Sequence, residues 1–396
     1  MKTGLFFLVI AYVLSQFYRA FLAVLSPVLG SEIGAGPEDL ALSSGLWFLA
    51  FALMQIPVGA ALDRIGPRWT VSVLLALGGG TGALVFSQAT GPWGIHLAMV
   101  LIGVGCSPVL MASYYIFGRS FRPALFGTLA AAIIGLGSLG NLAGAAPLAA
   151  VVAAFGWRET LIALAGVTLV VALALVIFVR DPERLVHAPG DGGSVLDVLR
   201  LPGLWLILPL AMTNYAAAAG IRGLWAGPYL ASVHGADAAL IGTVTLVMGL
   251  AMILGNFAYG PADRLFGSHK RVVLVGNIGL SLALAALWLT PGSGIWAAAA
   301  LLAAVGFLGA SFPVVMAHGR SFLPPHLLGR GVTLLNMFSI SGVALMQFAS
   351  RPVFEAASDG RDPAHAYGLL FLFFLLPNLV GIGFYLFARD RGEAGR

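Results

Sequence analysis

Three polar side chains recur along the first long apolar segment, at Tyr12, Gln16 and Arg19. Their spacing places all three on one face of an α-helix. Arg19 lies near the middle of the segment, where a charged side chain costs about 2.5–3.5 kcal/mol if the helix crosses a membrane. The sequence has no Asp or Glu in the interior of any such segment. A guanidinium without an acidic partner can bind a carboxylate or a phosphate through two parallel hydrogen bonds.

Polar side chains also lie inside the other apolar segments, and we predict that they line the same ligand-binding cavity. They are Tyr215, Arg222, Trp225, Asn141, Asn256, Asn336 and Gln347. Trp47, Tyr114 and Tyr115 would add apolar and stacking surface. Two alternatives stay open for the arginines. Backbone carbonyls at a helix kink could satisfy Arg19, and Arg222 could extend its guanidinium to the nearby membrane surface.

Composition identifies the class of protein that must hold these residues. Of the 396 residues, 59% are hydrophobic and only 9% are charged, and the mean hydropathy is +0.96. Soluble domains carry about 25% charged residues, so most of this surface must face lipid. The formal net charge is +5, but the Lys and Arg residues are scattered between apolar segments and form no patch. We therefore expect no nucleic-acid partner, and no sequence motif indicates a cofactor.

The apolar segments predict an all-α membrane protein with twelve transmembrane helices, because a spanning helix needs about 20 mostly apolar residues. The predicted spans are 4–30, 39–62, 69–89, 93–117, 123–154, 157–180, 203–231, 237–260, 271–290, 294–318, 326–354 and 364–388. The longest polar stretch divides them six and six. We therefore predict an N-terminal six-helix bundle over 1–180, a cytoplasmic linker over 181–202 and a C-terminal six-helix bundle over 203–396.

The basic residues predict the orientation of the chain. Most of the Lys and Arg residues fall in loops on the side of the two termini. Because cytoplasmic loops carry an excess of Lys and Arg, we expect both termini in the cytoplasm. We expect a multi-pass protein of the bacterial inner (plasma) membrane that acts as a monomer.

A repeat links the two predicted bundles. Asp63 and Asp263 lie 200 residues apart in similar charged loops, and Pro27 and Pro228 lie 201 residues apart. The short motifs FGRSF and HGRSF share the second offset. Six spans followed by a copy in the same orientation form a parallel repeat about an axis normal to the membrane.

The loop between the second and third predicted spans resembles the G-x-x-x-D-R-x-G-x-R motif of the major facilitator superfamily. The motif residues here are Gly59, Asp63, Arg64, Gly66 and Arg68, and a less complete second copy keeps Asp263 and Arg264. The resemblance covers the whole chain. It implies a gate that holds the cytoplasmic helix ends together in one conformation and releases them in the other. The alternative is that these charges only anchor the loop outside the lipid.

The resemblance also implies a function. It indicates a secondary transporter that moves a small solute by alternating access, with a cavity lined by its first, fourth, seventh and tenth helices. Arginines on the first and seventh helices resemble the organophosphate branch, although Arg222 lies two positions from the counterpart of Arg19 in the repeat. We therefore expect a small organic anion as the substrate. We expect no enzymatic activity, because no catalytic acid–base pair lies in a span.

Other interpretations stay open. A proton-coupled exporter of hydrophobic drugs would usually need an acidic residue in the cavity. A non-transporting receptor or assembly factor with the same fold need not keep two gate loops. Met248, Met252 and His318 could bind a soft metal such as Cu(I), although methionines at helical spacing more often pack in a core. We expect no metal site.

Overall fold

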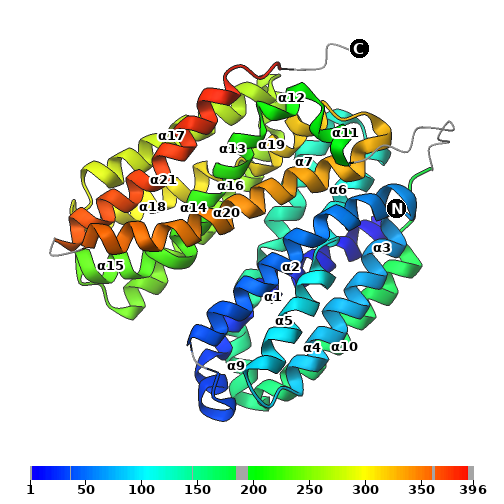
Figure 1. Cartoon of the computed structure of the whole chain (residues 1–396), viewed down its shortest axis with the longest axis horizontal. Helices are drawn as coiled ribbons and strands as arrows, with labels where there is room; N and C mark the ends of the chain where they lie inside the picture. The colour runs from blue at the N-terminus through cyan, green and yellow to red at the C-terminus, as the bar shows by residue number, and fades with distance from the viewer. Residues whose placement is uncertain (1, 36, 145, 184–194, 359–361, 391–396) are drawn as a thin grey trace. The chain divides into compact units, whose positions relative to one another are not determined.

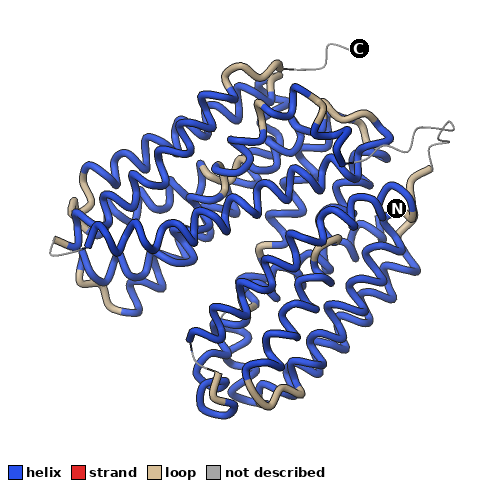
Figure 2. Tube along the Cα trace, in the orientation of Figure 1, coloured by secondary structure: helices blue, strands red, loops and turns tan. Residues whose placement is uncertain are grey.

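The computed structural model of the chain describes residues 2–35, 37–144, 146–183, 195–358 and 362–390. Every regular element in this described part is a helix, and no strand occurs there (Figure 2). The helices of the described part include eleven that are long and apolar enough to cross a membrane. The predicted all-α membrane fold is confirmed.

The first half of the chain forms helices α1 to α10, drawn from blue to blue-green in Figure 1. Their bounds are α1 Lys2–Ile33, α2 Pro37–Arg64, α3 Pro67–Leu74, η1 Leu75–Gly80, α4 Thr81–Ser87, α5 Pro92–Cys106, α6 Val109–Ser120, α7 Pro123–Gly137, α8 Leu139–Ala143, α9 Ala146–Phe155 and α10 Trp157–Phe178. Short breaks separate several of them, so that α5 and α6, for example, together fill the predicted span 93–117.

The second half forms helices α11 to α21, drawn from green to red. Their bounds are α11 Val195–Leu199, α12 Pro202–Trp205, α13 Leu208–Thr213, α14 Ala216–Gly220, η2 Ile221–Trp225, α15 Ala226–His234, α16 Ala238–Phe266, α17 His269–Leu289, α18 Ile295–Leu308, α19 Phe312–Arg320, η3 Pro325–Leu327, α20 Leu328–Ser358 and α21 Pro363–Tyr385. In this half, α18 and α19 share the predicted span 294–318.

The predicted span 203–231 differs from the continuous helix that the sequence suggested. It is built from the short pieces α12, α13, α14, η2 and α15. Pro209 lies in the first turn of α13, and proline has no amide hydrogen to donate to the preceding turn. The segment η2 is a π-helix, as is η1 in the first half of the chain. Such helices appear mostly as short bulges inside α-helices, frequently at functional sites. Breaks of this kind are tolerated at membrane depth where protein or a water-filled cavity surrounds them.

The described residues divide into two compact units. The first contains Met1–Phe126, Ile133–Val198 and Pro324–Leu334, and the second contains Gly127–Ala132, Leu199–Leu323 and Leu335–Arg396. Part of α7 therefore belongs to the second unit, and the first turns of α20 belong to the first. The predicted domain limits stay a prediction, and much of the predicted linker, at 184–194, lies outside the described residues.

Glycines allow close helix packing inside each unit. In the first unit, a Cβ atom on Gly140 of α8 would overlap the carbonyl oxygen of Val13 on α1. In the second unit, a Cβ atom on Gly342 of α20 would overlap the carbonyl oxygen of Met212 on α13. Small residues commonly mark the contact faces of membrane helices, because they let two backbones approach.

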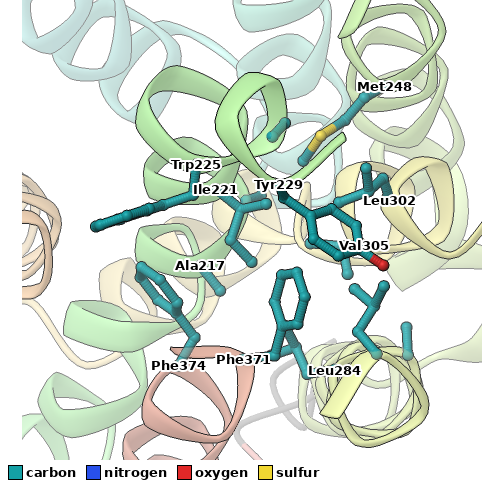
Figure 3. Packing of buried hydrophobic residues seen from close by; sticks show 14 of the residues in the cluster. Ala217, Ile221, Trp225, Tyr229, Met248, Leu284, Leu302, Val305, Phe371 and Phe374 are labelled. Atoms are coloured by element: carbon teal, nitrogen blue, oxygen red, sulfur yellow. The ribbon is translucent and has the colours of Figure 1, made fainter. Parts of the chain in front are cut away.

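Aromatic and branched side chains form the core of the second unit (Figure 3). The ring centroids of Tyr229 on α15 and Phe371 on α21 lie 5.0 Å apart in an edge-to-face arrangement. Leu284 of α17 and Val305 of α18 belong to the same buried cluster. Aromatic pairs of this geometry add about 0.5–1.5 kcal/mol beyond the area that they bury. This core holds α14, η2 and α15 in place despite their breaks.

Candidate functional site

Arg19 of α1 lies against the faces of two aromatic rings of α2. Its guanidinium carbon lies 5.1 Å from the centroid of the Trp47 ring and 5.2 Å from that of Phe51. A cation over an aromatic face gains about 0.5–2 kcal/mol. These contacts hold the guanidinium without neutralising it, and no carboxylate among the described residues pairs with it. Trp47 was expected from the sequence to line the cavity, which stays a prediction, and the contact of Arg19 with Phe51, one helical turn later, was not foreseen.

Several polar atoms of the first unit are buried and have no hydrogen-bond partner among the described residues. Besides the hydroxyls of Ser15 and Ser72, four of them belong to residues that were named from the sequence: the Nε atom of Arg19, the Nε1 atom of Trp47, the Oε1 atom of Gln16 and the hydroxyl of Tyr114. An unpaired buried polar group costs about 1–3 kcal/mol, so each requires an explanation such as a bound ligand or water. Three of these four named groups can donate a hydrogen bond, as can the two serine hydroxyls. This donor-rich set is suited to an acceptor-rich solute.

Tyr12 and Asn141 are the remaining candidates of the first unit. The ring of Tyr12 packs against Gly137 of α7, where a Cβ atom would overlap it. Asn141 is half-buried on α8, which packs along α1. The face of α1 that carries Tyr12, Gln16 and Arg19 therefore packs against other helices of the first unit, and Tyr12 and Gln16 are buried there.

Arg222 is the corresponding basic residue of the second unit. It belongs to the π-helix η2, and its guanidinium lies over Gly249 of α16. A Cβ atom on Gly249 would lie 2.9 Å from the Nη2 atom of Arg222. The Nε atom of Arg222 is buried and has no hydrogen-bond partner among the described residues. Glycine at this position of α16 therefore provides the space that the arginine occupies.

Trp225, Tyr215 and Gln347 have different environments in this unit. The indole Nε1 of Trp225 donates a hydrogen bond to the Ser350 hydroxyl at 2.9 Å, and the side chain is 7% exposed. This tryptophan therefore packs in the core and is held by α20. The ring of Tyr215 is half-buried, 6.3 Å from that of Phe312. Gln347 is half-buried, and its Cγ atom would lie 3.7 Å from a Cβ atom on Gly220.

The buried amides on α2 and α16 repeat one arrangement. The Nε2 atom of Gln55 donates to the Phe51 carbonyl at 3.1 Å, and the Nδ2 atom of Asn256 donates to the Met252 carbonyl at 2.9 Å. In each case the acceptor lies one helical turn earlier. Asn336 of α20 is 3% exposed. These amides are satisfied at least in part by protein, which distinguishes them from the unpaired groups near Arg19.

Arg351 does not share the environment of Arg19. Its Nε atom lies 2.8 Å from the Oε1 atom of Glu355 on the same helix, and both side chains are largely exposed. The Glu355 carboxylate therefore neutralises Arg351, whereas no carboxylate of the described residues pairs with Arg19.

The gate motif is built around Asp63, the penultimate residue of α2. Its Oδ1 atom accepts a hydrogen bond from the Gly329 amide at 2.9 Å. Its Oδ2 atom accepts hydrogen bonds from the Arg330 amide at 3.2 Å and from Nη1 of Arg330 at 2.9 Å. The two side chains of this ion pair are 4% and 6% exposed. Asp63 therefore binds the N-terminus of α20, where amide groups and the helix dipole favour an anion.

Two glycines of the motif make this arrangement possible. A Cβ atom on Gly59 would overlap the Thr333 hydroxyl and would lie 3.0 Å from Cα of Arg330. Gly66 has a φ of 105°, a backbone conformation that favours glycine. A Cβ atom there would also lie 2.8 Å from the carboxylate of Asp181. The motif glycines are therefore needed for close approach and for the turn.

The basic residues of the motif differ in their contacts. The Arg68 amide donates to Oδ1 of Asp181 at 2.8 Å, and its Nε donates to the Val176 carbonyl at 2.6 Å. Arg68 thus joins the turn to the end of α10, whereas Arg64 is exposed. The sequence did not identify Asp181 or Arg330 as partners. No local sequence pattern could identify either partner, because Arg330 lies 267 residues from Asp63 and Asp181 lies 113 residues from Arg68.

The second copy of the motif is only partly described. Asp263 and Arg264 lie within α16, but their side chains are outside the described part of the chain. Gly260 contacts α7: its carbonyl accepts a hydrogen bond from the Thr128 hydroxyl at 2.8 Å. A Cβ atom on Gly260 would lie 3.0 Å from the Cβ of Ala131. This contact is the counterpart of the approach of α20 to Gly59.

The residues considered for a soft metal have other roles in the fold. Met248 and Met252 belong to the buried hydrophobic cluster of the second unit. Nδ1 of His318 lies 2.6 Å from the Tyr385 hydroxyl, and Nε2 lies 3.1 Å from the Arg389 carbonyl. No group of three or more His, Cys, Asp or Glu residues in the described part could hold a metal ion.

Comparison with known proteins identifies the family. The profile of the Major Facilitator Superfamily matches residues 8–224, and the chain belongs to this family. The chain is 28% identical to the quinolone resistance transporter of Acinetobacter baumannii over 156 aligned residues. The aligned part covers 35% of this chain and 36% of that protein. The chain is 22% identical over 276 residues to the putative tartrate transporter of Agrobacterium vitis, covering 63% of this chain and 60% of that protein.

Solved structures share the fold over nearly the whole chain. FucP in its outward conformation has a TM-score of 0.78 at 16% identity, with 97% of this chain and 98% of that chain covered. The human organic anion transporter MFSD10 has a TM-score of 0.74 at 17% identity, with 96% and 99% covered. The proton:xylose symporter XylE has a TM-score of 0.74 at 13% identity, with 98% and 96% covered. The chain therefore has the fold of these solved transporters, in agreement with its membership of the Major Facilitator Superfamily.

Proposed function

We propose that the protein is a secondary active transporter that moves a small organic anion by rocker-switch alternating access. The observation that supports an anion is the setting of Arg19: a guanidinium between two aromatic faces, with a buried unpaired Nε and no carboxylate partner in the described part of the chain. A bound carboxylate or phosphate would supply both the countercharge and the hydrogen-bond acceptors that this group needs. Arg222 on η2 would be a second, weaker contact.

The names of the related proteins cover both candidate classes of solute. A tartrate transporter and an organic anion transporter agree with an anionic substrate, whereas a quinolone resistance transporter agrees with drug export. The aligned parts span only 36% to 60% of the curated relatives. Drug export is therefore the second candidate, and a neutral or cationic drug belongs in the substrate test.

In this mechanism Asp63 would act as a gate between the end of α2 and the start of α20. In the conformation with the ion pair formed, the carboxylate binds the amides of Gly329 and Arg330 and fixes the start of α20 to the end of α2. Release of these bonds would let the two helix ends separate, as alternating access requires. We also propose a location in the bacterial inner membrane, both termini in the cytoplasm and a monomeric state.

The experiment compares Arg19→Lys and Arg19→Ala with wild type in proteoliposomes. The solutes are carboxylates, phosphate esters and neutral and cationic analogues. We expect uptake of an anion in the wild type, weak binding in Arg19→Lys because the planar fork is lost, and no binding in Arg19→Ala. Arg222→Ala should weaken binding less.

Arg351→Ala is the matched control, since this arginine is exposed and paired with Glu355. It should transport as the wild type does. Preference of the wild type for neutral or cationic solutes would refute the proposal, as would normal transport by Arg19→Ala. An Arg19→Ala protein that fails to fold would make Arg19 a structural residue.

A further inference from the structure

A second polar cluster lies in the interior of the second unit. Asn214, Asn277 and Asn378 are all 0% exposed. The Nδ2 atoms of Asn214 and Asn277 both donate to the Ser311 hydroxyl, at 2.7 and 3.2 Å. The Nδ2 atom of Asn378 donates to the backbone carbonyl of Asn277 at 3.3 Å and to the Ser281 hydroxyl at 3.0 Å. Hydrogen bonds thus connect α13, α17, α21 and the start of α19.

The side-chain amide oxygens are the atoms of the cluster that the described residues leave unpaired. The Oδ1 atoms of Asn214, Asn277 and Asn378 are buried, and none has a hydrogen-bond partner among the described residues. The amide nitrogens of all three side chains are already used as donors. Three unpaired amide oxygens within one connected network are expensive in an apolar interior, unless an electropositive group binds them.

The fold itself does not require this cluster. The positions 201 residues earlier in the repeat are Val13 for Asn214 and Ala76 for Asn277, both apolar. The first unit therefore forms the same helices with apolar residues at these positions. Polar residues inside membrane helices are costly and generally serve a function.

Two interrupted helices meet at the cluster. Asn214 directly follows α13 and precedes α14, and Ser311 lies in the break between α18 and α19. At this break, a Cβ atom on Gly309 would lie 3.6 Å from the backbone carbonyl oxygen of Asn214. The backbones of the two interrupted segments are thus adjacent. In transporters, broken helices supply backbone carbonyls and helix C-termini that coordinate sodium ions.

We propose that this cluster is a binding site for a monovalent alkali cation, with sodium as the ion. Amide, hydroxyl and backbone oxygens are hard ligands, and a ring of such oxygens can replace the hydration shell of an alkali ion. The five residues of the cluster carry no carboxylate, so the site suits a single positive charge rather than calcium or magnesium. The site is separate from Arg19 and does not depend on the proposed anionic substrate.

The experiment measures sodium binding to the purified full-length protein in detergent, without any transported solute. The thermal unfolding midpoint is followed as sodium chloride replaces choline chloride at constant ionic strength, and radioactive sodium measures the bound ion directly. We expect a saturable rise of the midpoint with sodium, because a ligand that binds only the folded state stabilises it. The sodium-dependent rise should be lost in Asn277→Leu and in Asn214→Leu.

Thr168→Val is the matched control, because Thr168 is a buried polar residue of the first unit that bonds the Tyr18 hydroxyl at 2.8 Å. It should lower the midpoint but keep the sodium-dependent rise. The proposal is overturned if wild type binds no radioactive sodium, if choline gives the same midpoint as sodium, or if both asparagine variants keep the response. The first two outcomes need only wild-type protein, so poor folding of a variant does not prevent the decision.

Discussion

The Asp63 carboxylate accepts three hydrogen bonds from the first turn of α20, and neutralisation of its charge should weaken all three. Asp63→Asn leaves the Arg330 charge buried without a countercharge, and breaking such a pair costs about 3–5 kcal/mol. We expect near-normal expression, a fall in transport of about tenfold or more, and faster hydrogen–deuterium exchange at the Gly329 and Arg330 amides. Exchange measured by mass spectrometry gives this second readout without a substrate.

Further variants test whether the effect of Asp63→Asn comes from loss of the contact with α20 or from loss of a negative charge alone. Asp237→Asn removes an exposed carboxylate that accepts a hydrogen bond from the Leu240 amide, and it should leave exchange in α20 unchanged. Arg330→Gln should resemble Asp63→Asn, and the double variant should be no worse than either single one, since paired residues are not additive. Asp263→Asn should have a weaker effect than Asp63→Asn. If Asp63→Asn changes neither transport nor exchange, the Asp63 charge serves only to anchor the loop outside the lipid.

Much at the residue scale could be predicted from helical periodicity, and partners distant in sequence could not. The spacing of Gln16 and Arg19 placed them on one face of α1, and the motif identified Asp63. The positions of Phe51 and Arg330 depend on how α1 meets α2 and how α2 meets α20. The angle and position at which two helices cross depend on side-chain packing across the whole unit, so no local sequence pattern predicts them.

At the scale of elements, α2 and the start of α20 are held together by a glycine contact as well as by charge. Gly59→Leu would place a side chain into the Thr333 hydroxyl and the Arg330 backbone. We expect this variant to fold but to be unable to form the contact, so that the end of α2 and the start of α20 stay apart and transport is lost. Accessibility of a cysteine introduced at Thr333 to a membrane-impermeant thiol reagent should rise.

The control for this prediction lies on the same helix. A Cβ atom on Gly45 of α2 would meet no atom within 4 Å beyond its own helix backbone and chain neighbours, so Gly45→Leu adds the same side chain at an open position. It should keep wild-type transport and labelling. Equal labelling of the Gly59→Leu and Gly45→Leu proteins would contradict the contact role of Gly59.

The sequence predicted the number and place of the spans better than their continuity. Eleven predicted spans correspond to helices of spanning length. They could be predicted because a helix that crosses the bilayer needs about 20 mostly apolar residues, and such long runs are easily recognised in a sequence. The breaks in 203–231 were not predicted, although Pro209 and Gly220 lie within it. Proline and glycine occur in many continuous membrane helices. Whether one of them interrupts a helix depends on neighbours that can satisfy the freed backbone groups.

At the scale of the whole molecule, the absence of carboxylates from the span interiors of the sequence bears on energy coupling. A transporter driven by protons needs a group that titrates during transport, and Asp63 near a span end is already paired with Arg330. The asparagine cluster offers a site for sodium instead. We therefore expect that uptake of an anion that stays fully ionised is insensitive to the proton gradient and increases with an inward sodium gradient.

The measurement uses proteoliposomes loaded to impose each gradient separately, with a sulfonate analogue of the transported anion, because a sulfonate does not bind protons near neutral pH. Sodium stimulation in wild type and Thr168→Val, together with its loss in Asn277→Leu, would connect the cluster to transport. Collapse of sulfonate uptake on removal of the proton gradient would instead show that a protein group titrates. His318, bonded to Tyr385 and to the Arg389 carbonyl, would then be the first residue to substitute.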